Sequence, residues 1–188
     1  MRLFFAIELS GPVREHLASW RDDLKSRISN ASFTRDESLH ITLKFLGEVD
    51  PKGVEAIVES MQNIYVTKPI GLKANRIECF PDRGPIRIIA AGFDGELEML
   101  NALHRAIEQR CEKLGFAKEK RKYRPHVTLV RARPTLPAGL RAALDPESQE
   151  RWPSPEMQVE HFVLMRSHLT DQGSRYEVIC RFHPVKTE

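Results

Sequence analysis

Cysteine is scarce in this sequence, with three residues among 188. Cys79, Cys111 and Cys180 are far apart, and none belongs to a Cys-x-x-Cys pair. Disulfide-stapled folds and zinc knuckles need paired or closely spaced cysteines, so the sequence argues against both classes. We expect each thiol to be a small core side chain rather than a metal ligand.

Long hydrophobic runs are also absent. Near the N-terminus the apolar residues 3–7 lie between Arg2 and Glu8, and this run is too short for the core of a signal peptide. Nowhere else does an apolar stretch approach the ~20 residues that a membrane-spanning helix needs. The sequence therefore predicts a cytoplasmic protein without a membrane partner.

Aromatic residues and net charge are both modest. Phe, Trp and Tyr make up 7% of the chain, and no aromatic RNA-binding motif of the RNP type is present. The net charge of +3 tolerates an anionic ligand but does not demonstrate one. A phosphate loop of the GxxxxGK[ST] kind is missing, which argues against nucleotide hydrolysis by that route.

Helical and strand patterns alternate along the chain, which predicts an α+β fold. Apolar residues recur every three or four positions within residues 12–30, 51–64 and 95–114, the last stripe ending at Leu114. Short β-prone segments occupy residues 2–9, 39–46, 71–80, 86–93, 126–131, 159–166 and 176–182. The last two segments are predicted to form a hairpin whose turn contains Asp171 and Gly173.

Proline is concentrated in one part of the chain. Residues 134–155 hold five of the twelve prolines, so we expect a long surface loop there, with at most one short helix around Leu140. No break in composition separates two independent domains. The chain of residues 1–188 is therefore predicted to be a single domain, with 41% hydrophobic residues to form its core.

One short motif occurs twice, 86 residues apart, as His40-Ile41-Thr42-Leu43 and His126-Val127-Thr128-Leu129. Each copy opens an apolar, β-prone segment. Side chains alternate along a strand, so the His and Thr of each copy share one face while the apolar residues point to the other. If the two strands face each other, four polar groups converge on one small volume.

Such a volume suits phosphate transfer. An imidazole has an ordinary pKa of about 6.5, so one histidine can accept a proton from water while a second, protonated one donates to the leaving oxygen. The threonine hydroxyls can donate hydrogen bonds to phosphate oxygens. No metal or other cofactor is needed, and neither motif has nearby residues at the spacing of zinc ligands. Cyclic 2',3'-phosphates are suitable substrates, because ring strain helps to expel one ribose oxygen.

A structural interpretation stands beside this one. A single His-x-Thr at the start of a strand is more often a surface or hydrogen-bonded structural feature, whereas two copies in matching context favour function. The other five histidines lack such context and are expected to be structural or on the surface: His16, His104, His161, His168 and His183.

Positive charge surrounds the second motif. Lys118, Lys120, Arg121, Lys122 and Arg124 precede it, and Arg131 and Arg133 follow it, which is consistent with an anion funnel or with a solvated loop. Arg131 is near enough to His126 for its guanidinium to reach a phosphate. Arg87 could face the same cleft or the surface. Phe45 is expected to be in the core, and Tyr123 and Phe80 could stack on a base or pack internally.

The sequence resembles the 2H phosphoesterase superfamily at these residues, in particular the RNA 2',3'-cyclic phosphodiesterases that were once called 2'-5' RNA ligases. The resemblance covers nearly the whole chain. It is carried by the segments at residues 2–7, 39–47, 124–131 and 167–176. Two departures stand out: residues 35–39 read Arg-Asp-Glu-Ser-Leu where many relatives have Pro-Glu-Asn, and Val130 stands where alanine is common.

The resemblance implies two pseudo-symmetric lobes, each an antiparallel β-sheet with helices on the outside, and a groove between them. It implies that His40 is the proton donor and His126 the proton acceptor. Thr42, Thr128 and Arg131 would bind the phosphate, and neither a metal nor a cofactor would take part. RNA ends with a 2',3'-cyclic phosphate, tRNA fragments among them, would be opened to 2'-phosphates, and reversible 2'-5' ligation could accompany this.

Three alternatives remain open at this stage. The substrate could be a 2'-5' oligonucleotide or a small cyclic nucleotide, or the protein could bind RNA ends without turnover. In the absence of an exposed heptad or a long apolar edge, we expect a monomer.

Overall fold

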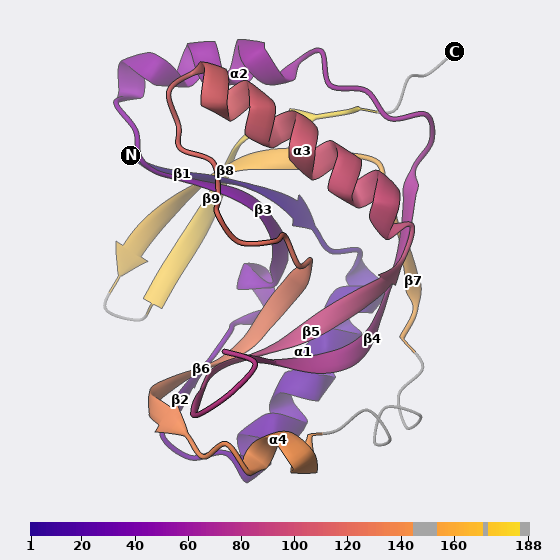
Figure 1. Ribbon diagram of the computed structural model, residues 1–188, viewed down its shortest axis with the longest axis vertical. Coiled ribbons are helices and arrows are strands. Elements are labelled where there is room, and N and C mark those ends of the chain that lie inside the picture. The colour runs from indigo at the N-terminus through magenta and orange to yellow at the C-terminus, as the bar shows by residue number, and fades with distance from the viewer. Residues whose placement is uncertain (145–153, 171–172, 185–188) are drawn as a thin grey trace.

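Two antiparallel sheets form the frame of the computed structural model, which describes residues 1–144, 154–170 and 173–184. The four-stranded sheet has the order β3 (His40–Glu48), β1 (Arg2–Glu8), β8 (Phe162–Thr170), β9 (Gly173–Phe182). The five-stranded sheet has the order β2 (Ala31–Phe33), β6 (His126–Leu136), β5 (Ile86–Gly95), β4 (Ile70–Phe80), β7 (Glu156–Val159). The predicted α+β class is confirmed (Figure 1).

Helices cover both sheets. They are α1 (Gly11–Arg27), α2 (Val54–Met61), α3 (Leu97–Lys113) and α4 (Leu140–Ala143), with short 3-10 turns at Asp36–Ser38 and Pro51–Gly53. In Figure 1 the four-stranded sheet lies in the upper half with α2 and α3, and the five-stranded sheet lies in the lower half with α1. The strands that carry the two motifs, β3 and β6, contact each other across the two halves.

The chain crosses between the sheets early. Helix α1 leaves β1 of the four-stranded sheet and packs against β6 of the five-stranded sheet, whereas α3 packs against β3. One apolar cluster contains residues of both sheets, including Phe5 and Leu43 on one side and Phe93 and Leu129 on the other. The two halves therefore share a core.

A β-bulge interrupts β3 directly after its threonine. The register of β1 pairs first with Thr42 and then with Lys44, so Leu43 has no partner. A skipped residue reverses the alternation of faces. Leu43 and Lys44 are consequently both buried, and Phe45 is 56% exposed on the same face as Thr42. The prediction that Phe45 belongs to the core is therefore wrong, because it assumed regular alternation.

The same irregularity occurs in β6. There β5 pairs with Thr128 and then with Val130, and Leu129 is skipped. Leu129 and Val130 are both buried, and Arg131 is exposed. From the histidine to the fifth residue after it, the two motif strands have the same sequence of buried and exposed positions.

The bulge in β3 places a charged side chain in the core. Lys44 is 2% exposed, and its Nζ lies 2.7 Å from Oε1 of Glu108 on α3 and donates to the carbonyl of Ala117 at 2.6 Å. Glu108 also accepts a hydrogen bond from the backbone of Glu119. A buried ion pair of this kind connects the motif strand to α3 and to the segment that leads into β6.

The remaining elements agree with the sequence in outline. Strands β2 and β7 were not predicted, because three or four residues are too short to show a period. The predicted loop over residues 134–155 begins inside β6 and includes α4 at its expected place, while residues 145–153 and Asp171 lie outside the described residues. Leu114, expected on the buried stripe of α3, is 37% exposed because α3 ends just before it.

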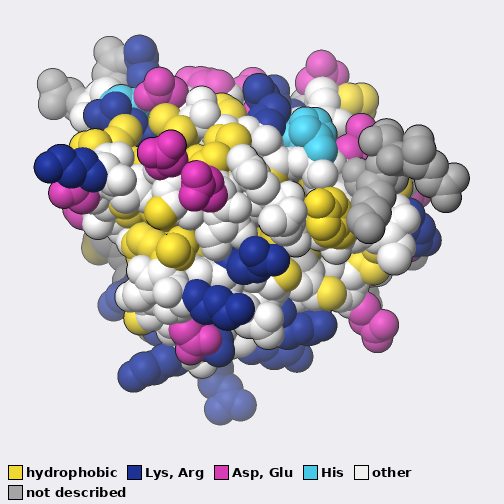
Figure 2. Space-filling model, turned by 90° about the horizontal axis from the view of Figure 1, so that it is seen from above, with side chains coloured by type: hydrophobic (Ala, Val, Ile, Leu, Met, Phe, Trp, Pro, Cys, Tyr) yellow, Lys and Arg dark blue, Asp and Glu magenta, His cyan; other side chains and the backbone are white. Residues whose placement is uncertain are grey.

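The thiols and the surface match expectation in part. Cys79 and Cys111 are free and buried, as predicted, but Cys180 is only half-buried. No helix within the described ranges is long and apolar enough to cross a membrane. On the face over α2 and α3, acidic, basic and apolar side chains are interspersed (Figure 2).

The Lys44–Glu108 ion pair yields a stability prediction. Lys44→Met should lower the free energy of unfolding by about 3–5 kcal/mol, because it leaves the Glu108 carboxylate buried and uncompensated. Replacing both residues by methionine should recover most of this loss. Urea unfolding followed by circular dichroism measures both, with Lys73→Met, at an exposed site on β4, as the control. Equal losses in the single and double variants would contradict the importance of the pairing.

Candidate active site

A groove of about 410 Å³ lies between the two sheets. The five residues that the sequence singled out all line it: His40, Thr42, His126, Thr128 and Arg131. Its other walls come from β1, from the turn before β3 and from the β8–β9 hairpin. The structure therefore brings both motifs into one volume.

The two histidines are held in the same way. His40 Nδ1 lies 2.8 Å from the carbonyl oxygen of Ser38, and His126 Nδ1 lies 2.8 Å from that of Arg124, in each case two residues earlier. A carbonyl oxygen can only accept, so Nδ1 carries the proton in both rings. In its neutral form each imidazole therefore has an unprotonated Nε2. His40 Nε2 lies 3.2 Å from the Thr42 hydroxyl.

Aromatic rings pack beside both imidazoles. The ring centroid of His40 lies 5.0 Å from that of Phe4 and 5.0 Å from that of Tyr176. His126 lies 5.0 Å from Phe80. These contacts restrict the orientations of the two rings.

The electrostatic surroundings of His40 favour its neutral form. Burial lowers the pKa of this imidazole to about 4, and the positive charge of Arg131 and the proximity of His126 act in the same direction. The hydrogen bond to Ser38 opposes these effects only in part. In the free protein His40 is therefore neutral at pH 7, with its proton on Nδ1.

The basic residues around the second motif separate into two groups. Of the seven, only Arg131 and Arg133 line the groove. Arg131 is exposed where it lines the groove, and it forms no ion pair with any described residue. Arg124 does not line the groove and pairs with Glu78 and Asp82, and Lys118 pairs with Glu112 at 2.7 Å. A funnel that includes all seven side chains is not what the structure shows.

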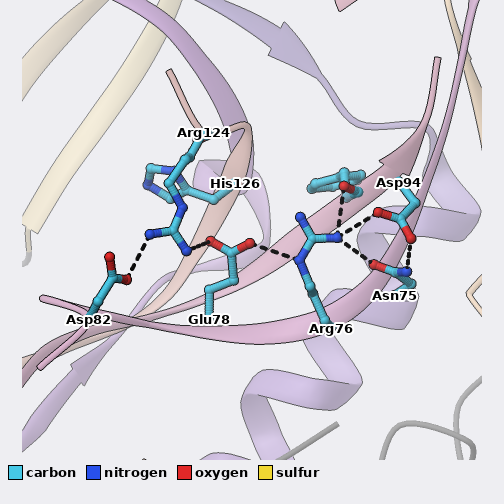
Figure 3. Close-up of polar contacts among 8 residues, drawn as sticks. Asn75, Arg76, Glu78, Asp82, Asp94, Arg124 and His126 are labelled. Atoms are coloured by element: carbon cyan, nitrogen blue, oxygen red, sulfur yellow. Dashed lines mark hydrogen bonds and ion pairs between the residues drawn. The ribbon is translucent and has the colours of Figure 1, made fainter. Parts of the chain in front are cut away.

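Arg124 belongs to an ion-pair network on β4 that the sequence did not reveal. Glu78 is 8% exposed and lies between two guanidinium groups, with Arg124 Nη2 and Arg76 Nε each 2.9 Å from its carboxylate oxygens (Figure 3). Arg124 also pairs with Asp82 at 2.7 Å, and its guanidinium carbon lies 4.7 Å from the centroid of the Phe80 ring. The network thus fixes the residue whose carbonyl holds His126.

A glycine makes room for this network. Gly92 on β5 pairs with His126 on one side and with Arg76 on the other. A Cβ at Gly92 would lie 2.6 Å from Glu78 Oε1 and 2.9 Å from Arg76 Nε. A side chain at Gly92 would therefore require Glu78 and Arg76 to move from their present positions.

Several other side chains that the sequence offered as candidates do not line the groove. Arg87 is exposed and does not line the groove. Tyr123 is packed inside: its hydroxyl donates to the carbonyl of Thr42, and its ring stacks on His104 at 3.9 Å. None of the five remaining histidines, all of them described, lines the groove. Within the described part of the chain, no group of three His, Cys, Asp or Glu side chains could hold a metal ion.

Two features of the candidate site were not predicted from the sequence. Phe45 lines the groove, and a comparison of the two motifs could have revealed it, because it stands at the same position after His40 as Arg131 does after His126. Glu78 carried no such signal. Its importance depends on pairing between strands, which one sequence does not record.

Known proteins are similar to this chain over nearly its whole length. The family model described as LigT like Phosphoesterase matches residues 7–90 and 94–176, one motif in each. An RNA 2',3'-cyclic phosphodiesterase of Methanocaldococcus jannaschii is 32% identical over 95% of this chain and 98% of its own. One from Methanothermobacter thermautotrophicus is 31% identical over 94% and 95%.

Solved structures have the same fold. The Thermus thermophilus protein TT0787 has a TM-score of 0.81 at 24% identity, over 100% of both chains. LigT of E. coli complexed with 3'-AMP has a TM-score of 0.78 at 23% identity, over 98% of both. The predicted arrangement of two lobes, each with an antiparallel sheet and helices, is confirmed by this likeness and by the topology.

The environment of His40 leads to a titration experiment. We expect its pKa to be near 4 in the free protein and to rise when an anion binds between the histidines, because a negative charge offsets that of Arg131. NMR titration of the ring, with and without dimethyl phosphate, measures this, and His40→Gln assigns the resonance. Dimethyl phosphate keeps one negative charge throughout, so the anion should bind more tightly as the pH falls toward 4. An unshifted pKa near 6.5 in both states would contradict this account.

The network around Glu78 predicts a selective effect. Glu78→Gln removes the charge between Arg124 and Arg76, so the Arg124 carbonyl should lose its fixed position and His126 should populate both neutral tautomers. Nitrogen-15 NMR of the imidazoles measures the tautomers. His40 is the internal control, because its Nδ1 donates a hydrogen bond to the carbonyl of Ser38, which lies outside the network. Equal responses of both histidines, or none, would refute the positioning effect.

Proposed function

Because the chain belongs to the LigT-like phosphoesterase family, we propose that it hydrolyses the 2',3'-cyclic phosphate at the end of an RNA to a 2'-phosphomonoester. The observation that carries this proposal is the convergence of two histidines, each with Nδ1 protonated and hydrogen-bonded to a carbonyl, on one groove with Arg131. Relatives more than 30% identical over nearly their whole length are named as enzymes of this activity.

The proton transfers follow from the two rings. His126 Nε2 accepts a proton from water as the water oxygen bonds to phosphorus. The bond between phosphorus and the 3' oxygen breaks, and that oxygen takes a proton from Nε2 of a protonated His40. The 2'-phosphate and a 3' hydroxyl are the products. Each histidine keeps its proton on Nδ1, which donates a hydrogen bond to a backbone carbonyl throughout, so Nε2 is the reacting nitrogen.

Substrate binding favours the protonated form of His40 that the donor role requires. His40 is neutral in the free protein, because its pKa is lowered to about 4 by burial and by Arg131. A phosphodiester brings a negative charge next to it and favours the imidazolium. His40 is therefore charged as a donor mainly in the complex, which couples proton uptake to binding.

The remaining groups stabilise charge on the phosphate. Thr42 and Thr128 can donate hydroxyl hydrogen bonds to its oxygens, and Arg131 can offer two parallel donors. Charge that develops on these oxygens is stabilised most where water is excluded. In this mechanism the chain's own side chains supply both proton transfer and charge stabilisation, without a metal.

The proposal is tested by turnover in EDTA. The purified protein should convert an oligonucleotide 2',3'-cyclic phosphate to its 2'-phosphate, and His40→Ala and His126→Ala should each lose about 10²–10⁴ in kcat/KM. His183→Ala, at an exposed site away from the groove, is the matched control.

Three results would contradict the proposal. If the protein were inactive in EDTA and regained activity only with added metal, the two-histidine mechanism would be wrong. Tight binding of the cyclic end without turnover would indicate an RNA-end-binding protein instead. Faster turnover of 2'-5' oligonucleotides or small cyclic nucleotides would change the substrate class but keep the chemistry.

A further inference from the structure

The side chain of Tyr123 connects the two motifs without lining the groove. Tyr123 stands three residues before His126, and its hydroxyl donates a hydrogen bond to the carbonyl oxygen of Thr42 at 3.2 Å. The two residues are 81 positions apart in the sequence. The bond therefore joins the segment that enters β6 of the five-stranded sheet to β3 of the four-stranded sheet.

A continuous series of contacts passes through this bond from one imidazole to the other. The Thr42 hydroxyl lies 3.2 Å from His40 Nε2, and the Thr42 carbonyl accepts from Tyr123. The residue after Tyr123 is Arg124, whose carbonyl oxygen lies 2.8 Å from His126 Nδ1. A movement of Tyr123 relative to Thr42 would therefore move one histidine relative to the other.

The phenol ring of Tyr123 is itself held in one orientation. It stacks on the His104 ring of α3, with the centroids 3.9 Å apart and the planes 8° from parallel, and it packs against the main apolar core. Burial raises the pKa of Tyr123 well above its ordinary value, so the hydroxyl keeps its proton at neutral pH. Tyr123 is therefore a hydrogen-bond donor of fixed position.

Lys44 attaches the same segment to β3 at a second point. Its Nζ donates to the carbonyl of Ala117 at 2.6 Å, and its ion-pair partner Glu108 accepts from the backbone of Glu119. The stretch from Ala117 to Tyr123 is thus hydrogen-bonded to β3 at both ends. Lys44 fixes its beginning, and Tyr123 fixes the end that leads into the second motif.

The position of β3 depends on contacts of this kind. It is an outer strand of its sheet and pairs with β1, and the free edge of such a strand presents backbone groups without a partner in the sheet. The hydrogen bonds from the imidazoles to Ser38 and Arg124 are local, so they orient each ring but do not set the distance between the rings. The bond between Tyr123 and Thr42 does act on that distance.

We propose that Tyr123 is a positioning residue, whose hydroxyl sets the spacing of His40 and His126 for the two proton transfers. The inference rests on the proposed function, in which both transfers occur at one phosphate. Such a reaction is sensitive to the placement of its groups, and a misplacement of about 1 Å can lower the rate by about 10²-fold. Without the hydroxyl each imidazole keeps its own carbonyl, but the two strands lose a bond that fixes their separation.

The main test removes the hydroxyl alone. Tyr123→Phe should lower kcat for adenosine 2',3'-cyclic phosphate by about tenfold, with little change in KM, because the groove keeps its lining side chains. Tyr65→Phe makes the same chemical change at an exposed ring outside the groove and should behave as the wild type. At position 123, 4-aminophenylalanine restores a donor and should recover most of the lost kcat, whereas 4-fluorophenylalanine should not.

A stability control separates positioning from a general loss of structure. Ile70→Val shortens a fully buried side chain on β4, a strand without any residue that lines the groove, so it destabilises the fold without touching either motif. All variants are assayed well below their unfolding midpoints, which circular dichroism measures. An equal fall of kcat in Ile70→Val and Tyr123→Phe would overturn the positioning role. Wild-type kcat in Tyr123→Phe, or a loss that 4-aminophenylalanine does not recover, would do the same and leave the proposed function intact.

A structural measurement separates this inference from the activity. Crystal structures of the wild type and of Tyr123→Phe give the distance between the two Nε2 atoms in each protein. If the wild type opens no cyclic phosphate, the proposed function is wrong, but a larger distance in Tyr123→Phe would still support the role of Tyr123 in setting it. An unchanged distance would overturn the inference whatever the activity.

Discussion

A skipped residue in each of two strands determines how this molecule builds its groove. In regular strands, Lys44 and Val130 would lie on the same face as the threonines, and the residues after them would point into the core. The bulges at Leu43 and Leu129 reverse this arrangement. The lysine is consequently buried against Glu108, and an aromatic ring and a guanidinium line the groove. The bulges thus determine which side chains a ligand can meet.

The frame around the histidines is symmetric, whereas their surroundings are not. In both rings Nδ1 donates a hydrogen bond to the carbonyl oxygen two residues earlier, which is a local consequence of how each strand begins. Around His126 an ion-pair network fixes that carbonyl, while around His40 aromatic packing and burial lower the pKa of the ring. A chemically equivalent pair is in this way given two different environments.

Much of this site could be predicted from the sequence, because its signal is local. Each His-x-Thr motif spans only a few residues, Arg131 follows the second motif closely, and strand alternation places the His and Thr of each motif on one face. Alternation failed at Phe45, where a bulge adds a residue that no period reveals. Alternation also gave no indication of Glu78, whose partner Arg124 comes from a distant part of the chain. Local sequence patterns therefore predict the reacting groups, whereas the residues that hold those groups in place depend on the pairing of strands.

The two sequence segments that match the family model do not coincide with the two sheets. The two segments that match the family model meet between residues 90 and 94, which is inside β5. Because α1 and β2 leave the first sheet to complete the second, neither matched segment contains a whole lobe. The lobes are interlocked by the backbone, so the spacing of the two histidines is a property of the complete chain. A chain that carried only one of the two segments would hold one histidine of the groove and neither complete sheet.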